Sequence, residues 1–145
     1  MELLKFYLDP AVLGTLGLMS FVMLAFAIER YIYFSRVRKQ LARFPHIEVL
    51  QIALTRNLTT ISSVASNAPY VGLLGTVLGI LVTFYEMGQG DGIDVSSIMV
   101  GLAMALKATA AGLLVAIPAM LFYNGLMRKV EVLVARWKAL QDGVA

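Results

Sequence analysis

Three threonines are set within apolar runs long enough to cross a membrane. Thr76 and Thr83 stand seven residues apart in one run, and Thr109 lies near the middle of the next. A spacing of seven places two residues on one face of a helix, two turns apart. Such hydroxyls either bond a backbone carbonyl one turn back or line a polar path. Because the threonines are grouped, we predict that they line a pore or contact a partner helix inserted in one.

Lys107 is the most costly residue of the chain, because an ammonium group in the hydrocarbon of a bilayer costs roughly 2.5 kcal/mol or more. We expect no carboxylate of this chain to reach it there. Glu86 and Asp91 are placed near the outer surface, and Glu29 lies at the inner end of the first helix. A carboxylate of a partner chain, or a polar subunit interface, is the sharper hypothesis. Snorkelling of the side chain to the surface is the alternative.

Small residues follow the same helical faces. Gly75 and Gly79 form a Gly-x-x-x-Gly step, which lets helix backbones approach closely, and Gly72 extends the same ridge. We predict that this face meets a second stripe of small residues, formed by Ala105, Thr109, Gly112 and Ala116. Pro118 should bend its helix because it lacks a backbone amide hydrogen, and we assign it a packing role only.

The usual catalytic residues are missing from the sequence. The chain has no cysteine and only one histidine, His46, which cannot form a metal cluster alone. There is no phosphate-binding loop, no nucleophile elbow and no HExxH motif. We therefore expect no enzymatic activity, no metal and no cofactor.

Composition indicates that the helices lie in a bilayer. Of the 145 residues, 59% are apolar and only 14% are charged, and the mean hydropathy is +0.80. A bilayer core of roughly 30 Å needs about 20 apolar helical residues, and residues 11–34, 69–87 and 96–124 supply three such stretches. The predicted fold class is an all-α membrane protein with three transmembrane helices, because period-two alternation typical of a barrel is absent.

Charge predicts how these helices are oriented, because basic residues are retained on the cytoplasmic side. The turn at residues 88–95 holds Asp91 and Asp94 and no basic residue. Basic residues instead follow the first and third helices, at Arg36, Arg38, Lys39, Arg43, Arg56, Arg128, Lys129, Arg136 and Lys138. We therefore place the N-terminus and the turn outside, and residues 35–68 and 125–145 inside.

The two inner segments are predicted to be helical extensions rather than a separate domain. Apolar residues recur every three or four positions on both sides of Pro45, which marks a break between short amphipathic helices. Val130, Leu133 and Trp137 share one face, so the third helix is expected to continue to about Leu140. Either these helices lie on the membrane surface, or they form an oligomeric cytoplasmic vestibule.

Two long motifs carry a family resemblance. Residues 68–80 read APYVGLLGTVLGI and residues 105–119 read ALKATAAGLLVAIPA, and Tyr123 and Asn124 follow. With Glu29 and Arg30 after the first helix, this pattern resembles the ExbB/TolQ/MotA family, and within it the ExbB branch. The resemblance spans essentially the whole chain.

The resemblance implies a proton channel subunit in the bacterial inner membrane, with a periplasmic N-terminus and a cytoplasmic C-terminus. It implies a homopentamer around about two copies of an ExbD-like single-span protein. Together with a TonB-like protein, the complex would use the proton motive force to energise outer-membrane transport. Thr76 and Thr109 match the family's pore threonines, and the membrane aspartate of the partner would carry the proton.

One residue departs from the family pattern. Many relatives carry a glutamate five residues before the threonine of the third helix, where this chain has Met104. The titrating group would then come from the partner, and Lys107 would pair with or position a buried acid. Two alternatives stay open: a TolQ-like subunit for envelope maintenance, and a structural membrane oligomer without proton coupling.

Overall fold

Four α-helices and one short 3-10 helix make up the chain in a computed structural model, which describes residues 2–90 and 94–143. They are α1 (Glu2–Val37), η1 (Leu41–Arg43), α2 (Ile47–Thr55), α3 (Leu58–Gln89) and α4 (Val95–Gln141). No strand occurs among the described residues. Three helices, α1, α3 and α4, are long and apolar enough to cross a membrane. The predicted fold class is therefore confirmed.

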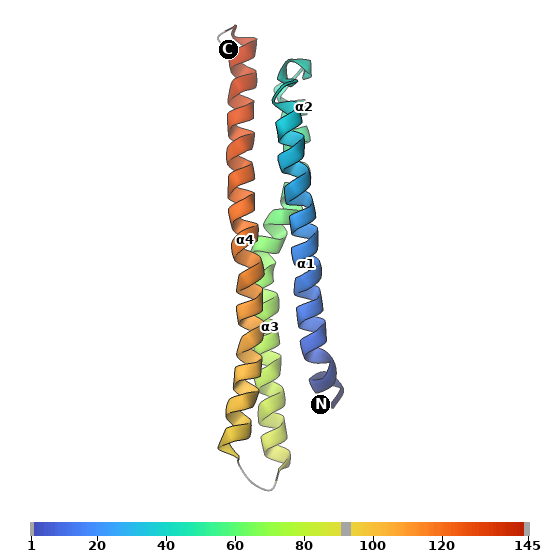
Figure 1. Ribbon diagram of the computed structural model, residues 1–145, viewed down its shortest axis with the longest axis vertical. Coiled ribbons are helices and arrows are strands. Elements are labelled where there is room, and N and C mark those ends of the chain that lie inside the picture. Colours follow the sequence, from blue (N-terminus) through green and yellow to red (C-terminus); the bar gives the residue numbers. More distant parts are fainter. Residues whose placement is uncertain (1, 91–93, 144–145) are drawn as a thin grey trace.

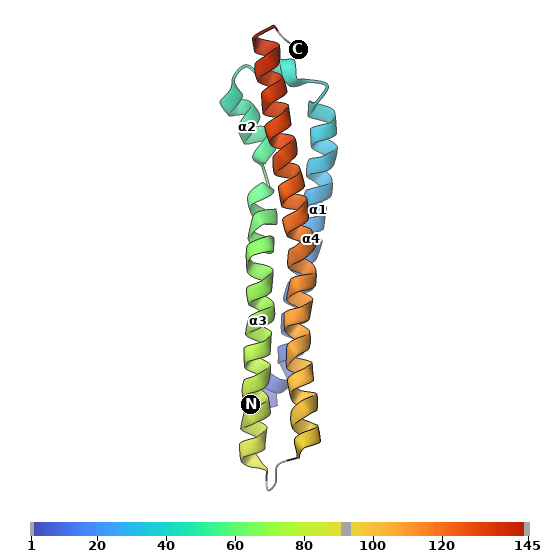
Figure 2. The same cartoon turned by 90° about the vertical axis from the view of Figure 1, so that its left-hand side faces the viewer.

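The three long helices run side by side along one axis (Figures 1 and 2). We call the end where α3 connects to α4 the hairpin end, and the N-terminus lies near it. The opposite end, which holds η1, α2 and the C-terminal part of α4, is the basic end. Most contacts between elements join α3 to α4, and α1 packs against both.

The helix bounds extend beyond the predicted membrane stretches. Helix α1 already starts at Glu2 and runs through Pro10, so Asp9 lies within a helix rather than before one. The predicted break near Pro45 is confirmed, since η1 and α2 lie on either side of it. The predicted extension of the last helix is also confirmed, because α4 continues to Gln141.

Buried apolar residues form two clusters along the bundle. The larger fills the basic end, where Leu50 and Leu54 of α2 are fully buried against the long helices. There the indole of Trp137 donates a hydrogen bond to the carbonyl of Phe44 at 3.1 Å. The smaller cluster joins Val12 and Leu16 of α1 to alanines of α3 and α4. The α3–α4 interface next to this smaller cluster holds the candidate site.

Candidate functional site

Small residues bring the backbones of α3 and α4 into direct contact. A Cβ atom added to Gly72 would lie 2.6 Å from the carbonyl oxygen of Ala108 and 3.1 Å from the Cα of Gly112. A Cβ added to Gly79 would lie 2.8 Å from the Cβ of Ala105. Gly75 faces both α4 and α1, because its added Cβ would lie 2.7 Å from the Cβ of Ala108 and 3.1 Å from Val12. The two stripes of small residues thus lie face to face.

Thr76 and Thr109 meet in this interface, with their hydroxyl oxygens in hydrogen-bond contact. The Thr76 hydroxyl also lies 3.0 Å from the carbonyl oxygen of Ala105 and 3.3 Å from that of Gly72. A hydroxyl carries one hydrogen and two acceptor lone pairs. If Thr76 donates to a carbonyl, Thr109 must donate to Thr76. The pair therefore forms a short hydroxyl chain that ends at a backbone carbonyl, and Thr76 is only 7% exposed.

Thr83 does not join this pair. Its hydroxyl donates to the carbonyl of Gly79 at 2.9 Å, one turn back along α3. A Cβ added to Gly101 of α4 would lie 2.6 Å from the Thr83 hydroxyl oxygen. The structure therefore brings two of the three predicted threonines together and leaves the third two turns nearer the hairpin end.

A cleft of about 540 Å³ opens between α1, α3 and α4 near the hairpin end. Its floor includes Gly79 and Ala105, so it reaches the residue whose carbonyl lies in hydrogen-bond range of Thr76. Met104, which is 45% exposed, lines one wall. The polar residues of the lining are Lys5, Asp9, Thr83, Glu86, Ser96 and Ser97. Polar side chains therefore line the cleft from the end of the bundle to Thr83, and the cleft itself reaches Ala105 at the edge of the threonine pair.

Lys107 has a carboxylate partner within the chain, and our expectation that none was in reach was wrong. Its Nζ lies 3.8 Å from an Oδ atom of Asp9, and the two side chains are 50% and 41% exposed. The expectation failed because Asp9 lies before the first apolar stretch in the sequence. Helix α1 begins more than two turns earlier than that stretch, so Asp9 is part of the helix. A parallel pair links Lys5 to Glu86 at 2.8 Å. Asp91 lies outside the described residues.

Arg30, which the sequence marked only as part of the family pattern after the first helix, is a buried residue. It is 3% exposed, it pairs with Glu29, and its guanidinium carbon lies 4.3 Å from the ring centre of Tyr33. One of its nitrogens donates to the carbonyl of Ala53 in α2 at 2.7 Å. Arg30 thus ties α1 to α2, a contact that no sequence spacing signals.

The structure also places Pro118 and His46, which were singled out in the sequence. Helix α4 runs through Pro118 without interruption. His46 is exposed in front of α2. Within residues 2–90 and 94–143, no three histidines or acidic residues come close enough to hold a metal ion.

Residues 34–139 match the MotA/TolQ/ExbB proton channel family. The biopolymer transport protein ExbB of Helicobacter pylori strain J99 is 51% identical over 141 residues, which cover 97% of this chain and 96% of that protein. ExbB of Aquifex aeolicus is 51% identical, covering 97% and 93% of the two chains. The Tol-Pal system protein TolQ of Pseudomonas aeruginosa is 34% identical, covering 75% of this chain and 53% of that protein.

These matches include the α3–α4 hairpin with its threonine pair and nearly all of α4. The family is one of channel and transport proteins rather than enzymes. Three apolar helices and matches of this extent agree, and the chain is a multi-pass membrane protein that belongs to the MotA/TolQ/ExbB proton channel family.

Proposed function

We propose that this chain is the proton channel subunit of an ExbB-ExbD-TonB type complex that uses the proton motive force to energise active transport across the outer membrane. The observation that carries the proposal is the hydroxyl contact between Thr76 and Thr109, which lies in a region matched to a proton channel family. Each hydroxyl can both accept and donate a hydrogen bond, as a group in a proton path must. To pass a proton on, Thr76 would exchange its bond to a backbone carbonyl for one to water or to a carboxylate.

The titrating group of this path is proposed to come from a partner. Met104 cannot titrate, and the two acids that line the cleft, Asp9 and Glu86, lie in ion pairs at the hairpin end. A membrane aspartate of an ExbD-like single-span protein would supply the carboxylate, and Thr76 and Thr109 would offer it hydroxyls. Thr83 would act nearer the surface, where it lines the cleft.

The proposed assembly is a homopentamer around about two copies of the ExbD-like protein, working with a TonB-like protein in the bacterial inner membrane. The N-terminus and the hairpin end would face the periplasm, and the basic end would face the cytoplasm. The distribution of basic residues supports this orientation.

A TolQ-like role in envelope maintenance is the second candidate. It is supported by the 34% identity to a TolQ protein, while the 51% identity to ExbB proteins favours the transport role. A structural oligomer without proton coupling is the remaining alternative, and the experiment below tests it.

The test removes each hydroxyl of the pair without changing side-chain shape. We expect Thr76→Val and Thr109→Val to assemble normally with the ExbD-like partner but to lose proton flux in proteoliposomes and TonB-dependent uptake in cells. Thr15→Val is the matched control, because Thr15 bonds only the carbonyl of Ala11 on an exposed face of α1. Native mass spectrometry of the co-expressed chains reports assembly.

Each outcome assigns one of the candidate functions. Full activity in both valine variants would overturn the pore-lining role of the threonines. A ring that forms without any partner and conducts no protons would favour the structural oligomer. Normal proton flux with rescue of envelope integrity, but not of uptake, would assign the TolQ-like role.

A further inference from the structure

A group of cationic side chains surrounds the place where α1 and α4 enter the basic end. Its members are Arg36, Arg38, Lys39, Arg43, Arg128, Lys129 and Arg136. Among the residues that the structure describes, the group makes a single ion pair, in which Arg128 and Glu131 are both largely exposed and 3.5 Å apart. The described part of the chain thus pairs only one of these seven cationic side chains with a carboxylate.

Four of these cations converge on one pocket between α1 and α4. The pocket has a volume of about 310 Å³ and is lined by Arg38, Arg128, Lys129 and Arg136, with no carboxylate in its lining. Lys129 is held in place over the ring of Tyr31, with its Nζ 4.7 Å from the ring centre. Guanidinium groups bind phosphate oxygens in pairs, so the pocket suits a phosphate group.

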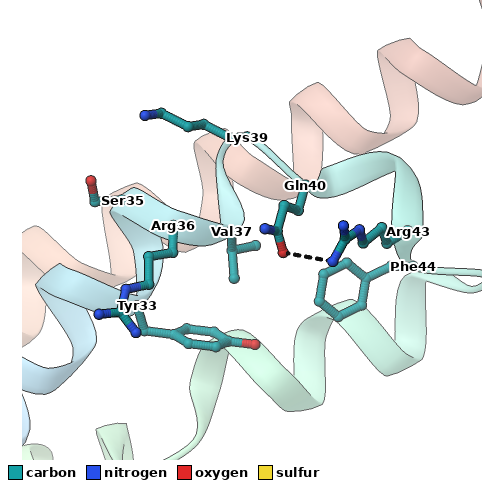
Figure 3. Close-up of a pocket in the computed structure, with 8 residues that line it drawn as sticks. All are labelled: Tyr33, Ser35, Arg36, Val37, Lys39, Gln40, Arg43 and Phe44. Atoms are coloured by element: carbon teal, nitrogen blue, oxygen red, sulfur yellow. Dashed lines mark hydrogen bonds between the residues drawn. The ribbon is translucent and has the colours of Figure 1, made fainter.

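A second basic hollow adjoins the first at the end of α1, and the two share Ser35. Figure 3 shows Arg36 lying along Tyr33, while Lys39 extends away from Val37 on the opposite side. The Arg43 guanidinium points toward Gln40, to which it donates a hydrogen bond at 3.4 Å. This second hollow extends the positive surface around the end of α1.

Exposed apolar residues lead from the membrane part of the bundle to the first pocket. On α1, Ile28 and Ile32 are 60% and 50% exposed, and their face continues to Ser35. On α4, Leu121 is 67% exposed and stands two turns before Arg128 on the same face. A lipid whose acyl chain lies along these residues would have its headgroup at the pocket. A free anion would make no contact with these apolar residues.

We propose that the pocket between α1 and α4 binds the phosphate of an acidic phospholipid from the leaflet at the basic end. Basic pockets between transmembrane helices on the cytoplasmic side commonly hold acidic headgroups. The buried side chains of Phe34 and Leu133 form the apolar wall on which the glycerol group packs. The site is separate from the threonine pair, so it stands whether or not the chain conducts protons.

Native mass spectrometry of the full chain in detergent tests the site, with dioleoylphosphatidylglycerol and dioleoylphosphatidylcholine as probes. We expect the phosphatidylglycerol adduct to be retained and the phosphatidylcholine adduct to be lost. Arg38→Gln with Arg136→Gln should weaken phosphatidylglycerol binding about tenfold or more. The matched control, Arg56→Gln with Lys138→Gln, removes the same charge outside both hollows and should change binding little.

Several results would overturn the proposal. Equal retention of both lipids would show that charge recognition is absent, and equal loss in the two double variants would show that binding depends only on net charge. Displacement of the lipid by excess inorganic phosphate would assign the pocket to a free anion. Loss of oligomers with unchanged lipid binding in the Arg38 and Arg136 variant would assign it to a neighbouring copy of the chain.

Discussion

At the scale of single residues, Lys107 and Asp9 form an ion pair that lowers the free-energy cost of placing either charge in a membrane helix. The two charged groups are 3.8 Å apart and both are about half exposed. In water, an ion pair of this kind contributes at most about 1 kcal/mol. Either charge alone in the bilayer costs roughly 2.5 kcal/mol or more. The main effect of the pair is therefore that each residue lowers the cost of the other.

Because each charge lowers the cost of the other, removing one of them should change the free energy of unfolding. Asp9→Asn should lower the free energy of unfolding by about 1 kcal/mol, because it leaves the Lys107 ammonium without its partner. Lys107→Met should remain inserted, and combining it with Asp9→Asn should recover part of the loss. Unfolding in SDS can be followed by the fluorescence of Trp137, which is the single tryptophan of the chain. Strictly additive effects of the two changes would show that the residues do not interact.

At the scale of elements, the close approach of α3 and α4 depends on glycine at two facing positions. A Cβ at Gly72 would meet the carbonyl oxygen of Ala108, and a Cβ at Gly112 would meet that of Ala68, each at 2.6 Å. Backbone atoms cannot rotate away as a side chain does. The helices would have to separate, and the hydroxyl contact between Thr76 and Thr109 would separate with them.

We expect Gly72→Ala to destabilise the protein by about 1–3 kcal/mol, as overpacking in a dense interface does. Gly14→Ala is the matched control, because nothing lies within 4 Å of a Cβ at that position of α1. Alanine there should stabilise the helix by up to about 1 kcal/mol. Thermal unfolding of both variants in detergent measures the difference. Equal melting temperatures would contradict the close approach of the backbones.

The facing stripes were predictable, because a spacing of three, four or seven fixes which residues share a helical face. Hence the contact between Thr76 and Thr109 follows from the sequence once α3 and α4 form a hairpin. The partner of Lys107 does not follow, because hydropathy marks where a helix is apolar and not where it begins. The carbonyl that Arg30 binds belongs to Ala53, and only the return of α2 along α1 brings the two together.

At the scale of the whole molecule, a cleft with a polar mouth opens between the three long helices and reaches the edge of the threonine pair. Ten residues separate Gly79 on the cleft floor from the end of α3 at Gln89, a distance of about 15 Å along the helix. Water that fills the cleft would reach about that depth. The interior of the bundle toward the basic end is closed by packed side chains.

Thiol labelling measures this depth without background, because the chain has no cysteine. We expect Thr83→Cys to react with a small membrane-impermeant methanethiosulfonate reagent added at the hairpin end, more slowly than the exposed control Ser97→Cys. Ala68→Cys should not react, because Ala68 is fully buried. Protection of Thr83→Cys equal to that of Ala68→Cys would show that the cleft is closed to water in the assembled protein.

Helix α4 is a single rod that runs the full height of the bundle. Its residues, Val95–Gln141, span about 70 Å, so a tilt of about 5° about one end displaces the other by about 6 Å. The helix has no loop to absorb such a movement, and Pro118 weakens its hydrogen bonding because proline has no backbone N–H. Pro118 lies midway along α4, so a bend there would displace the two ends of the helix by similar distances, and a push against the membrane half would be carried to the far tip.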